Sequence, residues 1–152
     1  MFRLCVYLLL ANRQTIIGVY PKGHGEEAIV MKKSFDGGIT WTDRLKVPGN
    51  WKTSKEVPTL HRVTDNRGVE RIIMFSGLYP IRMAISEDDG LSWSQLEPIG
   101  KYGGVVAMSD VICLKNGNYM AFFMTMDGSS IRQTKSPILI SKFFKRFQST
   151  AL

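Results

Sequence analysis

The sequence predicts an all-β chain built from repeated antiparallel sheets of four strands each. Three observations support this prediction: an octet of residues occurs twice, apolar residues gather in strand-length runs, and turn-forming residues recur between those runs. No run approaches the ~18 consecutive apolar residues that a membrane-spanning helix needs. We therefore expect no membrane span.

The repeated octet occupies residues 34–41 and 86–93, and both copies read Ser-x-Asp-x-Gly-x-Thr/Ser-Trp. The two serines lie 52 residues apart, and the similarity continues upstream, where residues 29–31 align with residues 81–83 without a gap. A repeat of this length predicts stacked supersecondary units.

Each octet is predicted to form the corner of a hairpin. Asp and Ser side chains at a strand end hydrogen-bond to backbone N–H groups a few residues further on, and glycine tolerates positive φ. The tryptophan then begins the return strand and covers the turn with a large apolar face. The aspartates are thus predicted to be turn formers rather than catalytic acids. The residues in this structural role are Ser34, Asp36, Gly38, Thr40, Trp41, Ser86, Asp88, Gly90, Ser92 and Trp93.

In the first unit, residues 1–48, apolar and β-branched runs predict four strands. These are residues 2–10, 15–20, 28–33 and 42–47. A turn around Asn12 and a loop over residues 21–26 separate the first three strands, and the octet precedes the fourth.

The pattern repeats over residues 49–100 and, in part, over residues 101–141. The predicted strands are residues 57–64, 69–75, 81–85 and 95–99 in the second unit, and residues 105–114, 119–125 and 137–141 in the third. Residues 126–136 are predicted to be a loop. No third octet follows, and residues 142–152 form a basic, phenylalanine-rich tail outside the repeat.

The octet resembles the Asp-box, or bacterial neuraminidase repeat, of sialidases and related β-propellers. The resemblance implies an incomplete sialidase-like propeller over residues 1–141, with about two and a half blades. A closed propeller needs at least about four blades, so we expect a fragment of a larger protein or a truncated gene product. Because each blade normally packs against two neighbours, we expect exposed apolar surface on both flanks, which favours self-association.

Composition limits the possible partners. The net charge of +7 suits an anionic ligand, but no basic stripe with interleaved aromatic residues predicts nucleic-acid binding. Cys5 and Cys113 fall in apolar runs and are expected to be buried thiols rather than a disulfide framework. Two histidines make a multi-histidine metal site improbable, and no cofactor is expected.

Connectivity divides the loops between two faces. The turns near Asn12, Asn66 and Asn116 share one face with the octets, and the opposite face carries the longer loops. Those loops are residues 20–27, 48–56, 76–80, 100–110 and 126–136. Long loops on a rigid scaffold are where binding residues usually lie. We therefore predict substrate binding on the face opposite the octets, by Arg3, His24, Glu56, Tyr79 and Asp110.

The resemblance implies roles for some of these residues. Sialidases typically open their first blade with Phe-Arg-Ile-Pro, whose arginine grips the substrate carboxylate. Residues 2–5 read Phe-Arg-Leu-Cys here, which puts Arg3 in that role, although Cys5 replaces the proline. A surface arginine at the start of a strand is the alternative.

The acid/base aspartate of sialidases lies just upstream of the first Asp-box, where this chain has Glu26 and Glu27. Adjacent glutamates can raise one another's pKa, as an acid catalyst requires, but they are also common as solvated loop residues. Sialidases need further arginines and a Tyr/Glu pair from later blades, and neither Arg82 nor Arg132 matches those positions.

The resemblance therefore implies a fragment of a sialidase-like exoglycosidase that acts on terminal sugars, anionic ones among the candidates. We do not expect this chain to be active alone. Two alternatives remain: a non-catalytic propeller segment that binds glycan or protein, and a gene remnant. A secreted or periplasmic parent fits the resemblance, and the residues themselves assign no location.

Overall fold

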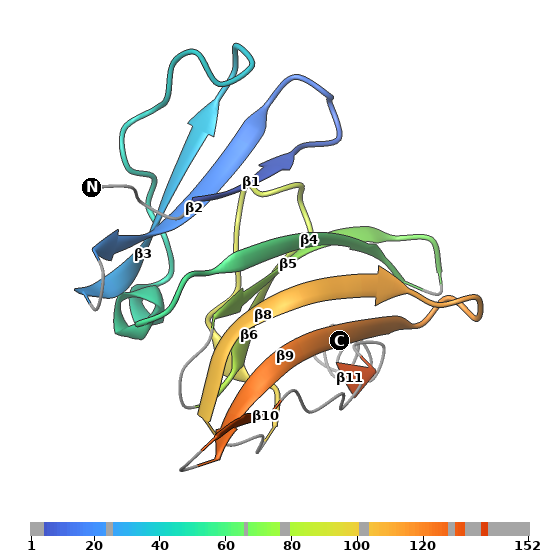
Figure 1. Cartoon of the computed structure of the whole chain (residues 1–152). Helices are drawn as coiled ribbons and strands as arrows, with labels where there is room; N and C mark the ends of the chain where they lie inside the picture. Colours follow the sequence, from blue (N-terminus) through green and yellow to red (C-terminus); the bar gives the residue numbers. More distant parts are fainter. Residues whose placement is uncertain are drawn as a thin grey trace, which may run out of the picture.

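The computed structural model describes residues 5–23, 26–65, 67–76, 80–100, 104–127, 130–132 and 138–139, with the backbone alone for 26–27, 104–109, 123–127, 130–132 and 138–139. Three antiparallel sheets follow one another in chain order and lie side by side (Figure 1). The described residues include one short 3-10 helix, η1 (Gly49–Thr53). In this part of the chain, no helix has the length and apolar character to cross a membrane.

The first sheet contains β1 (Val6–Leu9), β2 (Ile16–Gly23) and β3 (Glu26–Ser34), with β2 in the middle. The fourth strand predicted over residues 42–47 does not form. The segment follows the edge of β3 through two separated bonds, from Thr42 N–H to Lys33 O (2.9 Å) and from Leu45 N–H to Met31 O (2.9 Å). Two isolated bonds do not make a regular ladder.

The loop predicted over residues 21–26 is mostly strand. β2 and β3 remain paired to the pair Gly23 and Glu26, after a register shift between Pro21 and Gly23. Backbone pairing therefore continues across this bulge, and residues 24–25 lie outside the described residues. Glu26 and Glu27 consequently lie at the start of β3 and not in a loop.

The second sheet has the predicted four strands in chain order. They are β4 (Thr59–Thr64), β5 (Glu70–Ser76), β6 (Arg82–Ser86) and β7 (Glu97–Pro98). β5 is buried on both faces: Ile72 and Met74 face the first sheet, whereas Ile73 and Phe75 face the third. Burial on both faces explains why this strand reads as an unbroken apolar run.

The third sheet contains β8 (Gly104–Cys113), β9 (Tyr119–Asp127), β10 (Ser130–Arg132) and β11 (Ile138–Leu139). β10 and β11 pair with opposite ends of β9. The loop predicted over residues 126–136 is partly wrong, because β9 extends to Asp127 and β10 pairs with the end of β9. Residues 142–152, the predicted tail, lie outside the described residues.

Two apolar clusters join the sheets. Between the first and second sheets lie Ile17, Val19, Ile29, Met31, Trp51, Leu60, Ile72, Met74 and Ala84, with Leu10 and Leu96. Between the second and third sheets lie Val63, Ile73, Phe75, Ile81, Met83, Ile85, Ile99 and Ala121. The helix η1 contributes Trp51, which is fully buried and lies edge-on to Trp93 with ring centroids 5.5 Å apart.

Both octets fold as the same hydrogen-bonded turn. The hydroxyl of Ser34 donates to Asp36 Oδ1 and accepts from the N–H of Gly38, each at 2.8 Å. Asp36 accepts from the N–H of Thr40 at 2.9 Å and from its hydroxyl at 2.6 Å. The second octet repeats these bonds with Ser86, Asp88, Gly90 and Ser92.

These bonds hold the aspartates in their charged form. The hydroxyl and N–H of Thr40, with the hydroxyl of Ser34, lower the pKa of Asp36 to about 2. For Asp88, burial raises the pKa, but hydrogen bonds from Ser92 and Ser86 outweigh it and the pKa falls below its usual value. A carboxylate that stays ionised cannot protonate a leaving group, so the geometry supports the turn-forming role.

The expectation of two buried thiols is wrong for Cys113, which is exposed, while Cys5 is half-buried. Cys113 is the last residue of β8, next to the turn at residues 114–117, and no neighbouring element covers it among the described residues.

Candidate functional site

The structure confirms the division of the described loops between two faces. On the octet face, the N–H of Ala11, in the turn after β1, donates to Asp89 of the second octet at 2.9 Å. On the opposite face, which we call the loop face, η1 meets the start of β6, where Arg82 Nη1 donates to Thr53 Oγ1 at 2.6 Å. The antiparallel connectivity alone was enough to predict this arrangement.

Arg82 is a half-buried charged group on the described part of the loop face. Its Nη2 donates to the carbonyl of Thr53 at 3.1 Å, and its Nε is buried without a hydrogen-bond partner. Burial lowers the pKa of Arg82, and among the described side chains no carboxylate forms an ion pair with it. A half-buried guanidinium without a counter-charge is suited to an anionic ligand, since its planar fork can donate two hydrogen bonds to one carboxylate.

Hydroxyl groups lie next to Arg82. Ser76, which pairs with Arg82 across the sheet, has its hydroxyl 2.5 Å from that of Ser54, and both serines are buried. The carbonyl of Ser54 accepts from the N–H of Ala28 in β3 at 3.1 Å, which ties the first sheet to this position. Two hydrogen-bonded pairs, Arg82 with Thr53 and Ser54 with Ser76, therefore lie next to each other at this position.

Sequence reasoning did not single out this group. Arg82 matched no family position, and the serines and Thr53 carry no motif. Their proximity arises because η1 folds back against the second sheet and buries Trp51. The earliest signal available in the sequence was the tryptophan in a linker that was otherwise predicted to be an exposed loop.

The predicted binding residues do not all gather at one place. Glu56 is half-buried in the segment between η1 and β4, where its carbonyl accepts from the hydroxyl of Ser54 at 3.4 Å. Asp110 is exposed within β8, inside the strand predicted over residues 105–114, so the overlapping loop predicted over residues 100–110 is wrong from Gly104 onward. The residues Arg3, His24 and Tyr79, and the side chains of Glu26 and Glu27, lie outside the described part.

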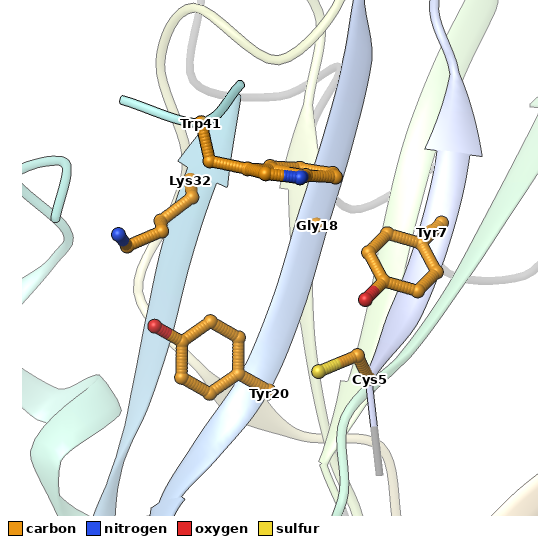
Figure 2. Close-up of a pocket in the computed structure, with 6 residues that line it drawn as sticks. All are labelled: Cys5, Tyr7, Gly18, Tyr20, Lys32 and Trp41. Atoms are coloured by element: carbon orange, nitrogen blue, oxygen red, sulfur yellow. The ribbon is translucent and has the colours of Figure 1, made fainter. Parts of the chain in front are cut away.

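A separate hollow of about 230 Å³ lies on the face of the first sheet that points away from the second sheet (Figure 2). It is lined by Cys5, Tyr7, Gly18, Tyr20, Lys32 and Trp41. Figure 2 shows Trp41 lying across Gly18, with the ring of Tyr7 on one side and Lys32 on the other. A hydrogen bond with Cys5 raises the pKa of Tyr7, and burial of the phenol raises it further.

Gly18 makes this hollow possible. A Cβ atom at Gly18 would lie 3.0 Å from Trp41 Cζ3 and 3.1 Å from Tyr7 Cε1, so a larger side chain would displace both rings. The rings of Tyr7 and Trp41 are in contact, with centroids 5.4 Å apart. Trp41 was predicted only as part of the octet, and the other five lining residues were not predicted to form a pocket.

No group of three or more His, Cys, Asp or Glu side chains within the described ranges could hold a metal ion.

No protein-family model matches the chain, and no curated protein matches it either. Among solved structures, the chain is similar to the GH93 alpha-L-arabinofuranosidase of Fusarium graminearum, whose structure was determined in complex with arabinobiose. The TM-score is 0.52 and the sequence identity 15%, and the match covers 79% of this chain and 39% of that enzyme.

The three sheets are therefore antiparallel blades of an incomplete β-propeller, as the repeated octets predicted. More particularly, the fold is similar to that of a propeller glycoside hydrolase. Because that enzyme is an arabinofuranosidase, the similarity does not indicate a sialidase in particular. The chain spans about 39% of the length of that enzyme, and identity at this level shows the fold alone.

Proposed function

We propose that this chain is part of a propeller glycoside hydrolase and that its loop face binds sugar. The observation that carries the proposal is Arg82, which lies with the exposed hydroxyl of Thr53 on the face where long loops meet. The similar arabinofuranosidase structure contains a disaccharide, which supports a carbohydrate ligand for the same fold.

The more specific proposal is a sialidase-like exoglycosidase that acts on a terminal anionic sugar. The two octets, the Phe2-Arg3 pair and the net charge of +7 support it. Arg82 adds a guanidinium that no described carboxylate neutralises. In this proposal Arg82 and Arg3 attract the sugar carboxylate, and Glu26 or Glu27 supplies the acid catalyst.

A second candidate function is binding without hydrolysis. The side chains that surround Arg82 among the described residues are those of Thr53, Ser54 and Ser76, and none of these three is a carboxylic acid. Most glycosidases place two carboxyl groups about 5–10 Å apart on either side of the scissile bond. A cation with hydroxyls can hold a sugar but cannot protonate its leaving group.

The test compares binding with hydrolysis for two sugars. Purified chain is titrated with a sialoside and with arabinobiose by calorimetry, and fluorogenic versions of both sugars report hydrolysis. The informative variant is Arg82→Gln, and its matched control is Arg67→Gln, which removes the same charge from an exposed arginine in the turn on the octet face. We expect Arg82→Gln to weaken sialoside binding at least about tenfold and Arg67→Gln to leave it unchanged.

The outcomes separate the candidates. Hydrolysis that disappears in Glu26→Gln or Glu27→Gln supports the enzyme, and sialoside binding without hydrolysis supports the second candidate. The loop-face site is refuted if neither sugar binds, or if both arginine variants weaken binding equally.

A further inference from the structure

The face of the first sheet that carries the hollow has exposed apolar side chains. Along β1, Val6 and Leu8 pack against the cluster shared with the second sheet, whereas Tyr7 and Leu9 are 57% and 49% exposed. Successive side chains of a strand point to opposite faces, so Tyr7 and Leu9 lie on the side away from the second sheet. We call this the open face of the first sheet.

The internal repeat shows what normally covers such a face. Strand pairing aligns the two sheets, because Ile16 pairs with Ser34 of the first octet just as Ile72 pairs with Ser86 of the second. Under this alignment, four residues of the open face have counterparts in the second sheet. Tyr7, Gly18, Lys32 and Trp41 correspond to Leu60, Met74, Ala84 and Trp93.

All four counterparts belong to the cluster that joins the first and second sheets. The open face is therefore equivalent to the face of the second sheet that the first sheet covers. In the described part of the chain, no element covers it.

The third sheet has the complementary exposed face. The turns after β4 and β8 close with equivalent hydrogen bonds, from Asp65 N–H to Val69 O and from Leu114 N–H to Asn118 O. Asp65 is therefore equivalent to Leu114, and Val63, two residues earlier, is equivalent to Ile112. Val63 is 1% exposed because the third sheet covers it, whereas Ile112 is 40% exposed.

Neighbouring residues on β8 support this alignment. Val111 packs toward the second sheet, so Asp110 and Ile112 lie on the opposite face. Asp110 is exposed there, while Lys32 lines the hollow of the first sheet. These two side chains carry opposite charges, and Asp110 also interacts electrostatically with His61 of β4.

We propose that the open face of the first sheet docks against the Ile112 face of the third sheet in a second copy of this chain. Within the chain, both sheet–sheet interfaces join these same two kinds of face. Two copies arranged head to tail form two identical junctions related by a two-fold axis, which leaves neither face open. The ring then holds about six sheets, within the range of about four to eight blades that propellers use.

The hollow fits this role. Gly18 replaces the methionine of the second sheet, which leaves space of about 230 Å³ for side chains of the incoming sheet. Tyr7 and Trp41 form its walls, and tyrosine and tryptophan are enriched among the residues that dominate binding energy at interfaces. Asp110 of the partner face provides a counter-charge for Lys32 on docking.

The association is tested by sedimentation equilibrium over a range of concentrations. One variant on each face, Leu9→Arg and Ile112→Arg, places a charge in the proposed junction. The matched control is Ile39→Arg, since Ile39 is 84% exposed on the first octet and lies on neither face. We expect the unaltered chain and Ile39→Arg to be dimers, and each of the other variants to raise the dissociation constant more than about tenfold.

Mixing the two variants tests the head-to-tail arrangement. An equimolar mixture of Leu9→Arg and Ile112→Arg retains one unaltered junction per mixed dimer, so we expect it to associate more tightly than either variant alone. Far-UV circular dichroism verifies folding, and Tyr7→Lys replaces Leu9→Arg if the latter unfolds.

Several results would overturn the inference. A monomeric chain at every concentration up to about 100 μM excludes the dimer as a specific assembly. Dissociation by Leu9→Arg without any effect of Ile112→Arg indicates that two first sheets pair face to face, which contradicts the head-to-tail arrangement. A mixture no tighter than its components contradicts it as well. None of these readouts depends on sugar binding, so the dimer and the proposed function can fail separately.

Discussion

The first and second sheets share a repeat but differ in what surrounds them. The second sheet is packed on both faces, and its middle strand carries Ile72, Ile73, Met74 and Phe75 in succession, all buried. The middle strand of the first sheet has Gly18 where that of the second sheet has Met74. The residues that line the hollow on the open face include three aromatic side chains and a lysine. A blade's sequence therefore reflects its neighbours as much as its own strand pairing.

The largest contrast is expected between two tryptophans. Trp51 is completely buried between the first and second sheets, and its Nε1 donates to the carbonyl of Ser94 at 3.3 Å. We expect Trp51→Ala to reduce the free energy of unfolding by about 3–5 kcal/mol. Trp41 lies on the open face, so Trp41→Ala should cost only about 1–2 kcal/mol.

Urea denaturation followed by circular dichroism measures both values, at protein concentrations where the chain is monomeric. Equal losses for the two tryptophans would show that the open face is covered within a single chain.

The next contrast exchanges the side chains at one repeat position. Met74 is fully buried, so Met74→Ala should leave a cavity and cost about 2–5 kcal/mol. Gly18→Ala forces Trp41 and Tyr7 to move, since the new Cβ would lie 3.0 Å and 3.1 Å from their rings. These rings border open space and alanine suits a strand better than glycine, so the net change should stay within about 1 kcal/mol. A loss for Gly18→Ala as large as for Met74→Ala would show that this face is rigidly packed.

A smaller effect concerns the polar link between the sheets. Asp89 adopts φ 53° and accepts hydrogen bonds from Ala11 N–H and Arg62 Nη2, both at 2.9 Å. The equivalent residue of the first octet is Gly37, with φ 74° and no such contacts. Asp89→Ala should cost about 2 kcal/mol, because it loses both bonds and keeps an unfavourable backbone, whereas Gly37→Ala should cost about 1 kcal/mol. The same denaturation experiment measures both, and no loss for Asp89→Ala would mean that the bonds of Asp89 contribute nothing.

Much of the fold was predictable because the octets combine a periodic position with a local turn chemistry. Ser34 and Asp36 determine the corner through bonds within a few residues, so no distant contact is needed to anticipate it. Strand limits were less predictable. The continuation of pairing to Gly23 and Glu26, and the strand β10, depend on a partner strand that local composition does not reveal.

The candidate site was predictable only as a face. Alternating connectivity assigns each loop to one side of the sheets, and the contact between Arg82 and Thr53 lies on the predicted side. The residues themselves were not predicted, because their proximity depends on how Trp51 packs η1 against the second sheet. For Asp110 the predicted strand over residues 105–114 is confirmed, and the overlapping loop predicted over residues 100–110 is wrong from Gly104 onward.

The smallest effect expected is on acid sensitivity, and it compares the octets with the rest of the surface. Folding lowers the pKa of Asp36 to about 2, through the hydroxyl and N–H of Thr40 and the hydroxyl of Ser34. An aspartate in an unfolded chain titrates near about 3.9, so the folded state holds its charge more strongly. The stabilising contribution is then fully present above pH about 4 and is lost as the pH falls toward about 2.

Asp36→Asn removes this titration. We expect the variant to be less stable than the unaltered chain at neutral pH and to lose less of its remaining stability between pH about 4 and about 2. Asp43→Asn, an exposed aspartate just beyond the octet, serves as the control and should retain the acid sensitivity of the unaltered chain. Urea midpoints are measured across this pH range for the three proteins. If the midpoints of Asp36→Asn and the unaltered chain fall equally with pH, the bonds from Thr40 and Ser34 do not favour the charged carboxylate.

Asp88→Asn should change acid sensitivity in the same direction but less, because burial opposes the hydrogen bonds that lower the pKa of Asp88. A larger change at Asp88 than at Asp36 would reverse the expected order of the two octets.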